Sequence, residues 1–217
     1  MAKLAEGTET PREEKRRWRT DRVVALLIFA RYGVPLLDGA ATDATASLAP
    51  FWVPPEVDSL LPAPWAARAH TDLDVKSPRL LTPAPLTWLN PPWGSGSFGT
   101  GAWVDRALEE RAQKRIGRLL LLVPEATDTI WWWKAARVAT EAVSLGRIAY
   151  LRPNGDRVGS PPQGSTLFVI DPASPNSLSA LVEAARPRVS LVKWDAPRLA
   201  QRQAAKLPRP SQGPHVR

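Results

Sequence analysis

The segment Asn90-Pro91-Pro92-Trp93 combines two prolines with an amide and an indole side chain. Consecutive prolines fix the backbone and remove two N–H donors, which leaves the Asn90 amide oxygen and the Pro91 carbonyl as acceptors at fixed positions. Two such acceptors would draw the hydrogens of a conjugated amino group out of its plane and localise the nitrogen lone pair. If the amino group belongs to a nucleobase, Trp93 could stack on the face of that nucleobase. The alternative is a loop in which the prolines only stop a strand and the tryptophan packs.

A second polar signal is Asp38-Gly39-Ala40-Ala41, an acid followed by small residues that would let a ligand approach the backbone closely. It follows the apolar run 34–37, and Asn90 follows the apolar run 86–89, so both signals stand where a buried strand ends. Ligands of open α/β sheets bind beyond the carboxyl ends of the strands. We therefore expect the two segments to line one site.

Hydrophobic periodicity predicts the elements that position these segments. Helices are expected over 21–31, 101–115, 128–140 and 178–186, with Thr20 and Thr127 as N-caps and Gly33 and Gly117 as stops. Strands are expected over 34–37, 86–89, 118–123, 142–145, 166–170 and 189–192. About fifty residues after Asp38 show little periodicity and are expected to form loops and short helical turns. Alternating strands and helices predict an α/β domain, with a mostly parallel central sheet flanked by helices.

The formal net charge of +8 is concentrated at the two ends of the chain. Residues 198–217 contain five basic residues and no acidic one, whereas residues 21–197 contain 18 basic and 17 acidic residues. We expect a flexible charged segment over 1–17, a folded domain over 18–195 and a basic disordered tail over 196–217. Contact of the tail with phosphates and a purely solubilising role both stay open. The same two readings apply to Arg147, Arg152 and Arg157, which lie around an expected loop at Asn154-Gly155.

Composition excludes several classes of function. The chain has no cysteine and only His70 and His215, so disulfide frameworks, cysteine-bound zinc, thiol nucleophiles and multi-histidine metal sites are ruled out, and no metal is expected. The longest apolar runs, 23–30 and 119–123, are shorter than the ~20 residues of a membrane helix. Charges fill the first twenty residues, which argues against a secretory signal. We expect a soluble cytoplasmic protein with no membrane partner.

The order of these motifs resembles the phage-type, Dam-like DNA adenine methyltransferases. Asn90-Pro91-Pro92-Trp93 resembles the Asn-Pro-Pro-aromatic motif of amino-group methyltransferases, and Asp38-Gly39-Ala40-Ala41 is similar to the Asp-Pro-Ala-Ala of this family, with glycine in place of proline. Trp18-Arg19-Thr20 resembles its Trp-x-Thr, and Asp58-Ser59-Leu60 its Asp-x-Leu. The likeness runs from about Trp18 to Asp171 in consistent order.

This resemblance implies a Rossmann-like methyltransferase domain, encoded by a phage and acting in the cytoplasm of the bacterial host. It implies transfer of a methyl group from S-adenosylmethionine to the exocyclic amine of adenine in double-stranded DNA, with the base flipped out of the duplex. The implied catalytic residues are Asn90, Pro91, Pro92 and Trp93. The implied cofactor-binding residues are Trp18, Thr20, Asp38, Gly39, Ala40 and Asp58, with Asp72 or Asp74 as alternatives to Asp58.

Local chemistry leaves other acceptors open, because cytosine and the side chain of glutamine in proteins also present a conjugated NH₂ group. A catalytically inactive DNA-binding protein on the same fold is a further alternative. The sequence sets neither the recognition sequence nor the oligomeric state.

Overall fold

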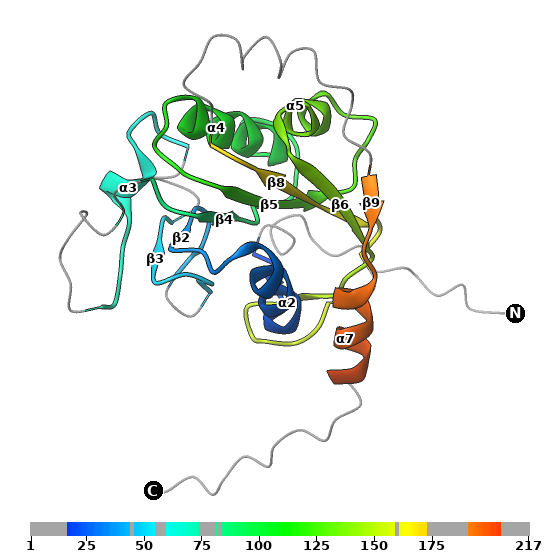
Figure 1. Ribbon diagram of the computed structural model, residues 1–217. Helices are drawn as coiled ribbons and strands as arrows, with labels where there is room; N and C mark the ends of the chain where they lie inside the picture. The colour runs from blue at the N-terminus through cyan, green and yellow to red at the C-terminus, as the bar shows by residue number, and fades with distance from the viewer. Residues whose placement is uncertain are drawn as a thin grey trace, which may run out of the picture.

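The computed structural model describes residues 17–43, 46–54, 60–73, 81, 84–158, 161–172 and 191–204. These residues form a seven-stranded sheet with helices on both faces and a separate two-stranded ribbon (Figure 1). In chain order the elements are β1 (Arg19–Thr20), α2 (Arg22–Tyr32), β2 (Leu37–Asp38), β3 (Phe51–Trp52), α3 (Trp65–Arg68), β4 (Thr87–Leu89), α4 (Thr100–Ala112), β5 (Leu119–Pro124), α5 (Ile130–Val138), β6 (Glu141–Gly146), β7 (Tyr150–Leu151), β8 (Ser165–Ile170), β9 (Leu191–Lys193) and α7 (Ala196–Ala204).

The large sheet has the strand order β3-β2-β4-β5-β8-β6-β9. Among the described strands only β8 runs against its neighbours, since it pairs antiparallel with both β5 and β6 while the other four pairings are parallel. The expected mostly parallel α/β sheet is therefore confirmed. The antiparallel partner of β5 was not foreseen, because a strand buried on both faces has the same apolar sequence whichever way its neighbour runs.

The core is divided between the two faces of this sheet. Along β5, Leu119, Leu121 and Val123 pack on the side covered by α4 and α5. Leu120 and Leu122 pack on the opposite side, which α2 covers. This alternation follows from the two-residue period of a strand, and Figure 1 shows the resulting three layers.

Two helices begin later than the sequence suggested. Asp21, rather than Thr20, caps α2, because its carboxylate accepts the N–H of Val23 at 2.8 Å. Thr20 lies one residue earlier, in β1. The N-cap of α5 is Thr129 and not Thr127.

Of the two expected helix stops, Gly33 is confirmed for α2 and Gly117 is wrong for α4. Gly33 ends α2 with a φ of 104°, as expected. α4 ends at Ala112 and not near Gly117, and Lys114 turns the chain with a φ of 57°. Gly117 serves a close approach instead, since a Cβ there would lie 2.6 Å from the carbonyl oxygen of Ala84.

The expectation of a disordered tail over 196–217 is wrong for its first nine residues, which form α7. Gln201 is 3% exposed, and its side chain accepts the N–H of Ala149 at 2.9 Å and donates to the Ala149 carbonyl at 2.8 Å. This two-way hydrogen bond fixes α7 to the body of the protein. The remaining domain boundaries stay predictions, and the helix expected over 178–186 lies outside the described residues.

Candidate active site

The two polar segments meet at the point where the strand order of the sheet reverses. β2 and β4 are parallel neighbours in which Asp38 pairs with Trp88, and the Gly39 N–H donates to the Trp88 carbonyl at 2.9 Å. The chain continues from β2 outward to β3 but from β4 to β5 on the other side. Such a switch point leaves room for a ligand between the two outgoing loops. Asn90 follows β4 directly, so it lies beside the loop that begins at Asp38.

The Asp38 carboxylate is buried and held by its own loop. Asp38 is only 4% exposed. One carboxylate oxygen accepts the N–H of Ala40 and the other accepts the N–H of Leu48, each at 3.1 Å. Burial raises the pKa of Asp38 to about 6, and the two N–H donors limit this rise because they stabilise the charged form. The carboxylate therefore ionises near neutral pH and stabilises positive charge that comes close to it.

The small residues after Asp38 serve different purposes. A Cβ on Gly39 would lie 3.1 Å from the ring of Trp65 and 3.2 Å from Leu89, so glycine here makes room for core packing. Ala40 and Ala41 line the pocket itself. The close approach of a ligand to the backbone stays a prediction for the two alanines, whereas Gly39 is packed against a tryptophan.

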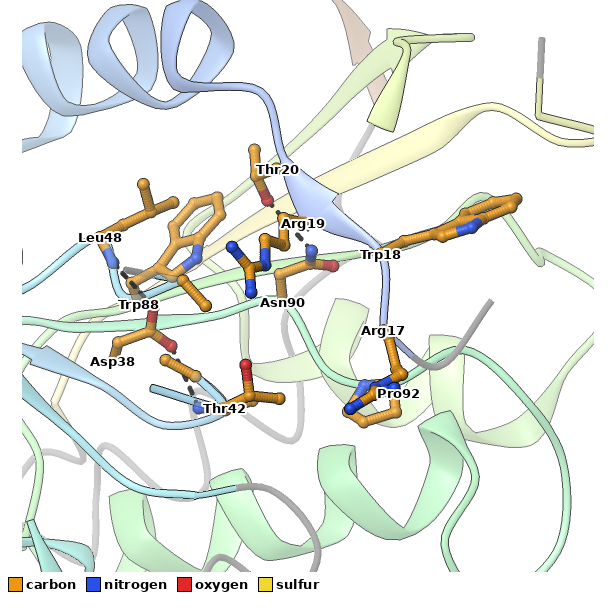
Figure 2. A pocket seen from close by; sticks show the side chains of 13 residues that line it. Arg17, Trp18, Arg19, Thr20, Asp38, Thr42, Leu48, Trp88, Asn90 and Pro92 are labelled. Carbon is orange, nitrogen blue, oxygen red and sulfur yellow. Dashed lines mark hydrogen bonds between the residues drawn. The ribbon is translucent and has the colours of Figure 1, made fainter. Parts of the chain in front are cut away.

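Asn90 presents one satisfied and one unsatisfied end of its amide. Its Nδ2 donates to Oγ1 of Thr20 at 3.0 Å, whereas its Oδ1 is buried and has no hydrogen-bond partner among the described residues (Figure 2). An unpaired buried acceptor ordinarily costs about 1–3 kcal/mol, so native proteins retain few of them outside functional sites. Oδ1 is therefore a buried acceptor, unpaired within the described segments, at the end of a central strand.

The N-terminal ribbon completes the site from a distant part of the sequence. β1 pairs antiparallel with β7, which places Thr20 opposite Tyr150. Trp18 stacks on the Tyr150 ring at 6.0 Å between centroids, and Trp93 meets the same ring edge-on at 4.8 Å. Trp18, Trp93 and Tyr150 form an aromatic group next to the Asn90 segment.

The glycine-rich loop after Trp93 is folded onto the start of α4. The Thr100 hydroxyl donates to the carbonyl of Pro92 and accepts the N–H of Gly94, both at 3.4 Å. Gly99 lies so close to Gly94 that a Cβ would come within 2.6 Å of its carbonyl oxygen. These contacts fix the position of Pro92 relative to the start of α4, next to the exposed glycine-rich loop.

A pocket opens between the N-terminal ribbon, the Asp38 loop and the end of β4 (Figure 2). It is lined by Arg17, Trp18, Arg19, Thr20, Asp38, Ala40, Ala41, Thr42, Ala46, Leu48, Trp88, Asn90 and Pro92. Six of the ten site residues that the resemblance implies thus line one cavity: Trp18, Thr20, Asp38, Ala40, Asn90 and Pro92. Pro91 and Trp93 are neighbours of this lining but not part of it.

Other sequence-based candidates fall elsewhere. Asp72 is exposed and does not line the pocket, and Asp58 and Asp74 lie outside the described residues. Arg157 contacts the protein itself, because its guanidinium lies 3.3 Å from the Asp21 carboxylate and donates to the Gln201 carbonyl at 3.1 Å.

Sequence reasoning did not single out Arg17, Arg19 or Trp88 for this pocket. The signal that would have found Trp88 is its place in the predicted strand, two residues before Asn90; in the structure it is the pairing partner of Asp38. Arg17 and Arg19 flank Trp18 and point to no role by spacing alone. In the structure Arg19 forms an ion pair with Asp43 at 3.4 Å.

Within the part of the chain that the structure describes, no group of three or more His, Asp or Glu side chains could hold a metal ion. None of the described helices is long and apolar enough to cross a membrane.

A buried acid and an amide acceptor at adjoining strand ends define an α/β protein with a ligand pocket at the switch point of its sheet. The chain belongs to the DNA N-6-adenine-methyltransferase (Dam) family, whose model matches residues 7–189. This match confirms the resemblance found in the sequence.

The chain is also similar to the DNA N-6-adenine-methyltransferase of Escherichia phage T1, with 23% identity over 181 residues. The aligned part is 76% of this chain and 66% of the phage protein, so the chain spans just under two thirds of that relative. No solved structure matches the chain.

Proposed function

We propose that this protein transfers a methyl group from S-adenosylmethionine to the exocyclic amino group of adenine in DNA. The observation that carries the proposal is the buried Oδ1 of Asn90, which has no hydrogen-bond partner in the described part of the chain and lies at the strand-end pocket that Asp38 also lines. Membership of the Dam family supports the same reaction and substrate.

The residues at the Asp38 end of the pocket fit a positively charged methyl donor. Asp38 supplies a buried carboxylate that titrates near neutral pH, and Ala40 and Ala41 leave the backbone open beside it. We assign Asp38 and Ala40 to the methionine part of the donor, with Gly39 shaping the turn and Trp18 at the opposite wall. Asp58 is kept as a candidate for the adenosine part. When bound, S-adenosylmethionine supplies an electrophilic methyl carbon on a sulfonium.

The residues at the Asn90 end fit an aromatic amine. Oδ1 of Asn90 and the carbonyl of Pro91 would accept the two hydrogens of the amine, which localises the nitrogen lone pair for attack. Trp93 offers an aromatic face for the base, and a base inside a duplex has to be flipped out to reach it. Because Oδ1 is buried, we expect the pocket lining to shift when a base enters.

No residue has to remove a proton before the methyl group is transferred. The lone pair of the neutral amine would form the new N–C bond as the C–S bond of the methyl donor breaks, with the electron pair of that bond left on sulfur. The methylated nitrogen would then lose one proton to water or through the Asn90 amide. Positioning by Asn90 and Pro91 is therefore the main contribution of this end of the site.

The reaction is tested by incubating the purified protein with DNA of varied sequence and labelled S-adenosylmethionine, and by identifying the modified nucleoside after digestion. We expect N6-methyladenine. Methylcytosine would assign the same site to another amine, label in protein would indicate glutamine, and binding of DNA without cofactor binding or methylation would indicate an inactive relative.

Replacing Asn90 with alanine should lower turnover by about 100-fold or more, by analogy with loss of one preorganised polar group in other active sites. Calorimetry with S-adenosylmethionine serves as the control, because the variant should still bind the donor. Full activity of this variant would refute the role given to the amide oxygen.

A further inference from the structure

We propose that Thr20 is a positioning residue that holds the NH₂ end of the Asn90 amide in place for catalysis, an inference that rests on the function proposed above. Its hydroxyl accepts from Nδ2 of Asn90 at 3.0 Å, while Oδ1, the other end of the amide, has no partner among the described residues. This role differs from the cofactor contact that the sequence resemblance implies for Thr20.

The orientation matters because the two ends of an amide have opposite chemistry. Oδ1 can accept a hydrogen bond from the substrate amine. The NH₂ end cannot, because it and the amine are both hydrogen-bond donors. A threonine hydroxyl can donate as well as accept, so it tolerates either orientation of the amide. It is the substrate amine that selects Oδ1, and Thr20 then provides the partner that the NH₂ group needs in that state.

Thr20 is itself held firmly on both sides. It is 5% exposed and pairs with Tyr150 across the ribbon. The next residue, Asp21, caps α2 through the N–H of Val23 and forms an ion pair with Arg157 at 3.3 Å. The β-branched side chain of threonine also has restricted rotamers. The hydroxyl is therefore a fixed point from which the amide of a residue seventy positions later is aligned.

The test compares Thr20→Val, which keeps the shape but loses the acceptor, with Thr20→Ser, which keeps the hydroxyl. Thr166→Val is the matched control, because Thr166 is equally buried and its hydroxyl accepts from Nε1 of Trp132 at 3.3 Å, away from the pocket. Turnover is measured at saturating donor and DNA, together with the Kd for S-adenosylmethionine and the melting temperature.

We expect Thr20→Val to lower kcat about tenfold, the effect of one hydrogen bond, with the Kd for S-adenosylmethionine changed less than about twofold. Thr20→Ser should recover most of the activity. Thr166→Val should lower the melting temperature without changing kcat. In the Asn90→Ala background, adding Thr20→Val should cost nothing more, because the amide that Thr20 holds is gone.

Three results of the turnover and binding measurements would overturn the proposal. A raised Kd for S-adenosylmethionine with unchanged kcat in Thr20→Val would make Thr20 a cofactor contact. Equal losses in Thr20→Val and Thr20→Ser would show that the hydroxyl is not what matters. Wild-type turnover in Thr20→Val would show that the amide needs no partner.

A readout without turnover separates this proposal from the proposed function. The side-chain NH₂ resonances of Asn90, assigned by their loss in Asn90→Ala, should exchange slowly with water in the wild type and in Thr20→Ser, and faster in Thr20→Val. Unchanged exchange in Thr20→Val would remove the contact on which the proposal depends. If the contact is present but the wild type methylates no amine, the proposed function fails and the catalytic assignment of Thr20 fails with it.

Discussion

Raising the pH from 5 to 7 should strengthen the binding of S-adenosylmethionine about tenfold through the ionisation of one buried carboxyl group. Asp38 lines the pocket, is 4% exposed and has a pKa raised to about 6 by burial. The methyl donor carries a sulfonium and an ammonium group over this pH range. It should therefore bind mainly to the form of the protein in which Asp38 is ionised.

The magnitude follows from the fraction of protein in the binding-competent form. With a pKa of about 6, roughly one molecule in eleven has an ionised Asp38 at pH 5, and roughly ten in eleven at pH 7. The apparent Kd scales inversely with this fraction, which gives the tenfold change. An aspartate with an ordinary pKa, about 3.9, would be largely ionised at both pH values and would give almost no change.

Isothermal titration calorimetry at pH 5, 6 and 7 and constant ionic strength measures this effect. In buffers of different ionisation enthalpy, binding at pH 5 should also release close to one proton, since Asp38 loses its proton when the donor binds. His70→Gln is the control for a histidine contribution, because His70 packs on Trp52 and does not line the pocket. It should keep both effects.

Asp38→Asn should bind the donor weakly at every pH and release no proton. Equal affinity of the wild type at pH 5 and pH 7 would refute the reasoning, because it would mean that the Asp38 carboxylate does not face the positive charge of the donor.

The same pKa has the opposite effect on the stability of the protein without cofactor. The folded state binds the Asp38 proton more tightly than the unfolded state, so the stabilisation is complete below the unfolded pKa and is lost as the pH rises to about 6. The rise of the Asp38 pKa to about 6 corresponds to roughly 3 kcal/mol of this stabilisation. Ionised Asp38 is thus retained at a cost in stability, which is expected of a group kept for binding.

The remaining predictions concern the buried ion pairs and the basic tail. Glu110→Ala should lower the free energy of unfolding by about 3–5 kcal/mol in urea titrations, because the fully buried Glu110 is the shared partner of Arg106 and Arg115. Glu109→Ala removes a half-exposed partner of the same Arg106 and should cost less than about 1 kcal/mol, and equal losses in the two variants would contradict this account. Truncation after Ala204 removes three basic residues and should reduce the log–log slope of DNA affinity against salt by up to about 2.7 if all three contact phosphates. An unchanged slope would leave the tail a solubilising role.

The strand ends were predictable because local sequence marks them. Leu86 to Leu89 is an apolar run stopped by two prolines, and Asp38 ends another, so burial and the absence of a backbone donor placed Asn90 and Asp38 at carboxyl ends before any contact was known. Parallel pairing of β2 with β4 then brings them together.

The contacts of the N-terminal ribbon were not predictable in the same way. Each of its strands is two residues long, too short to show a period, and the paired residues Thr20 and Tyr150 are 130 positions apart in the sequence. Thr20 was expected to be a helix cap, since a threonine before an apolar helical pattern favours that role. The neighbouring Asp21 takes the cap instead, and this competition between two capping residues is what leaves the Thr20 hydroxyl to meet Asn90.

The helix α7 links the C-terminal part of the chain to the N-terminal ribbon and so to the Asn90 site. Gln201 is bonded to both backbone groups of Ala149, the residue before Tyr150, and Tyr150 pairs with Thr20. A continuous set of contacts therefore joins α7 to the Asn90 amide. Truncation after Asp195 would remove α7 and loosen β7, so it should lower the melting temperature and turnover together. A cut after Ala204 keeps Gln201 in place. Of the two truncations, only this one tests the charge of the tail without also removing the contact of α7 with Ala149.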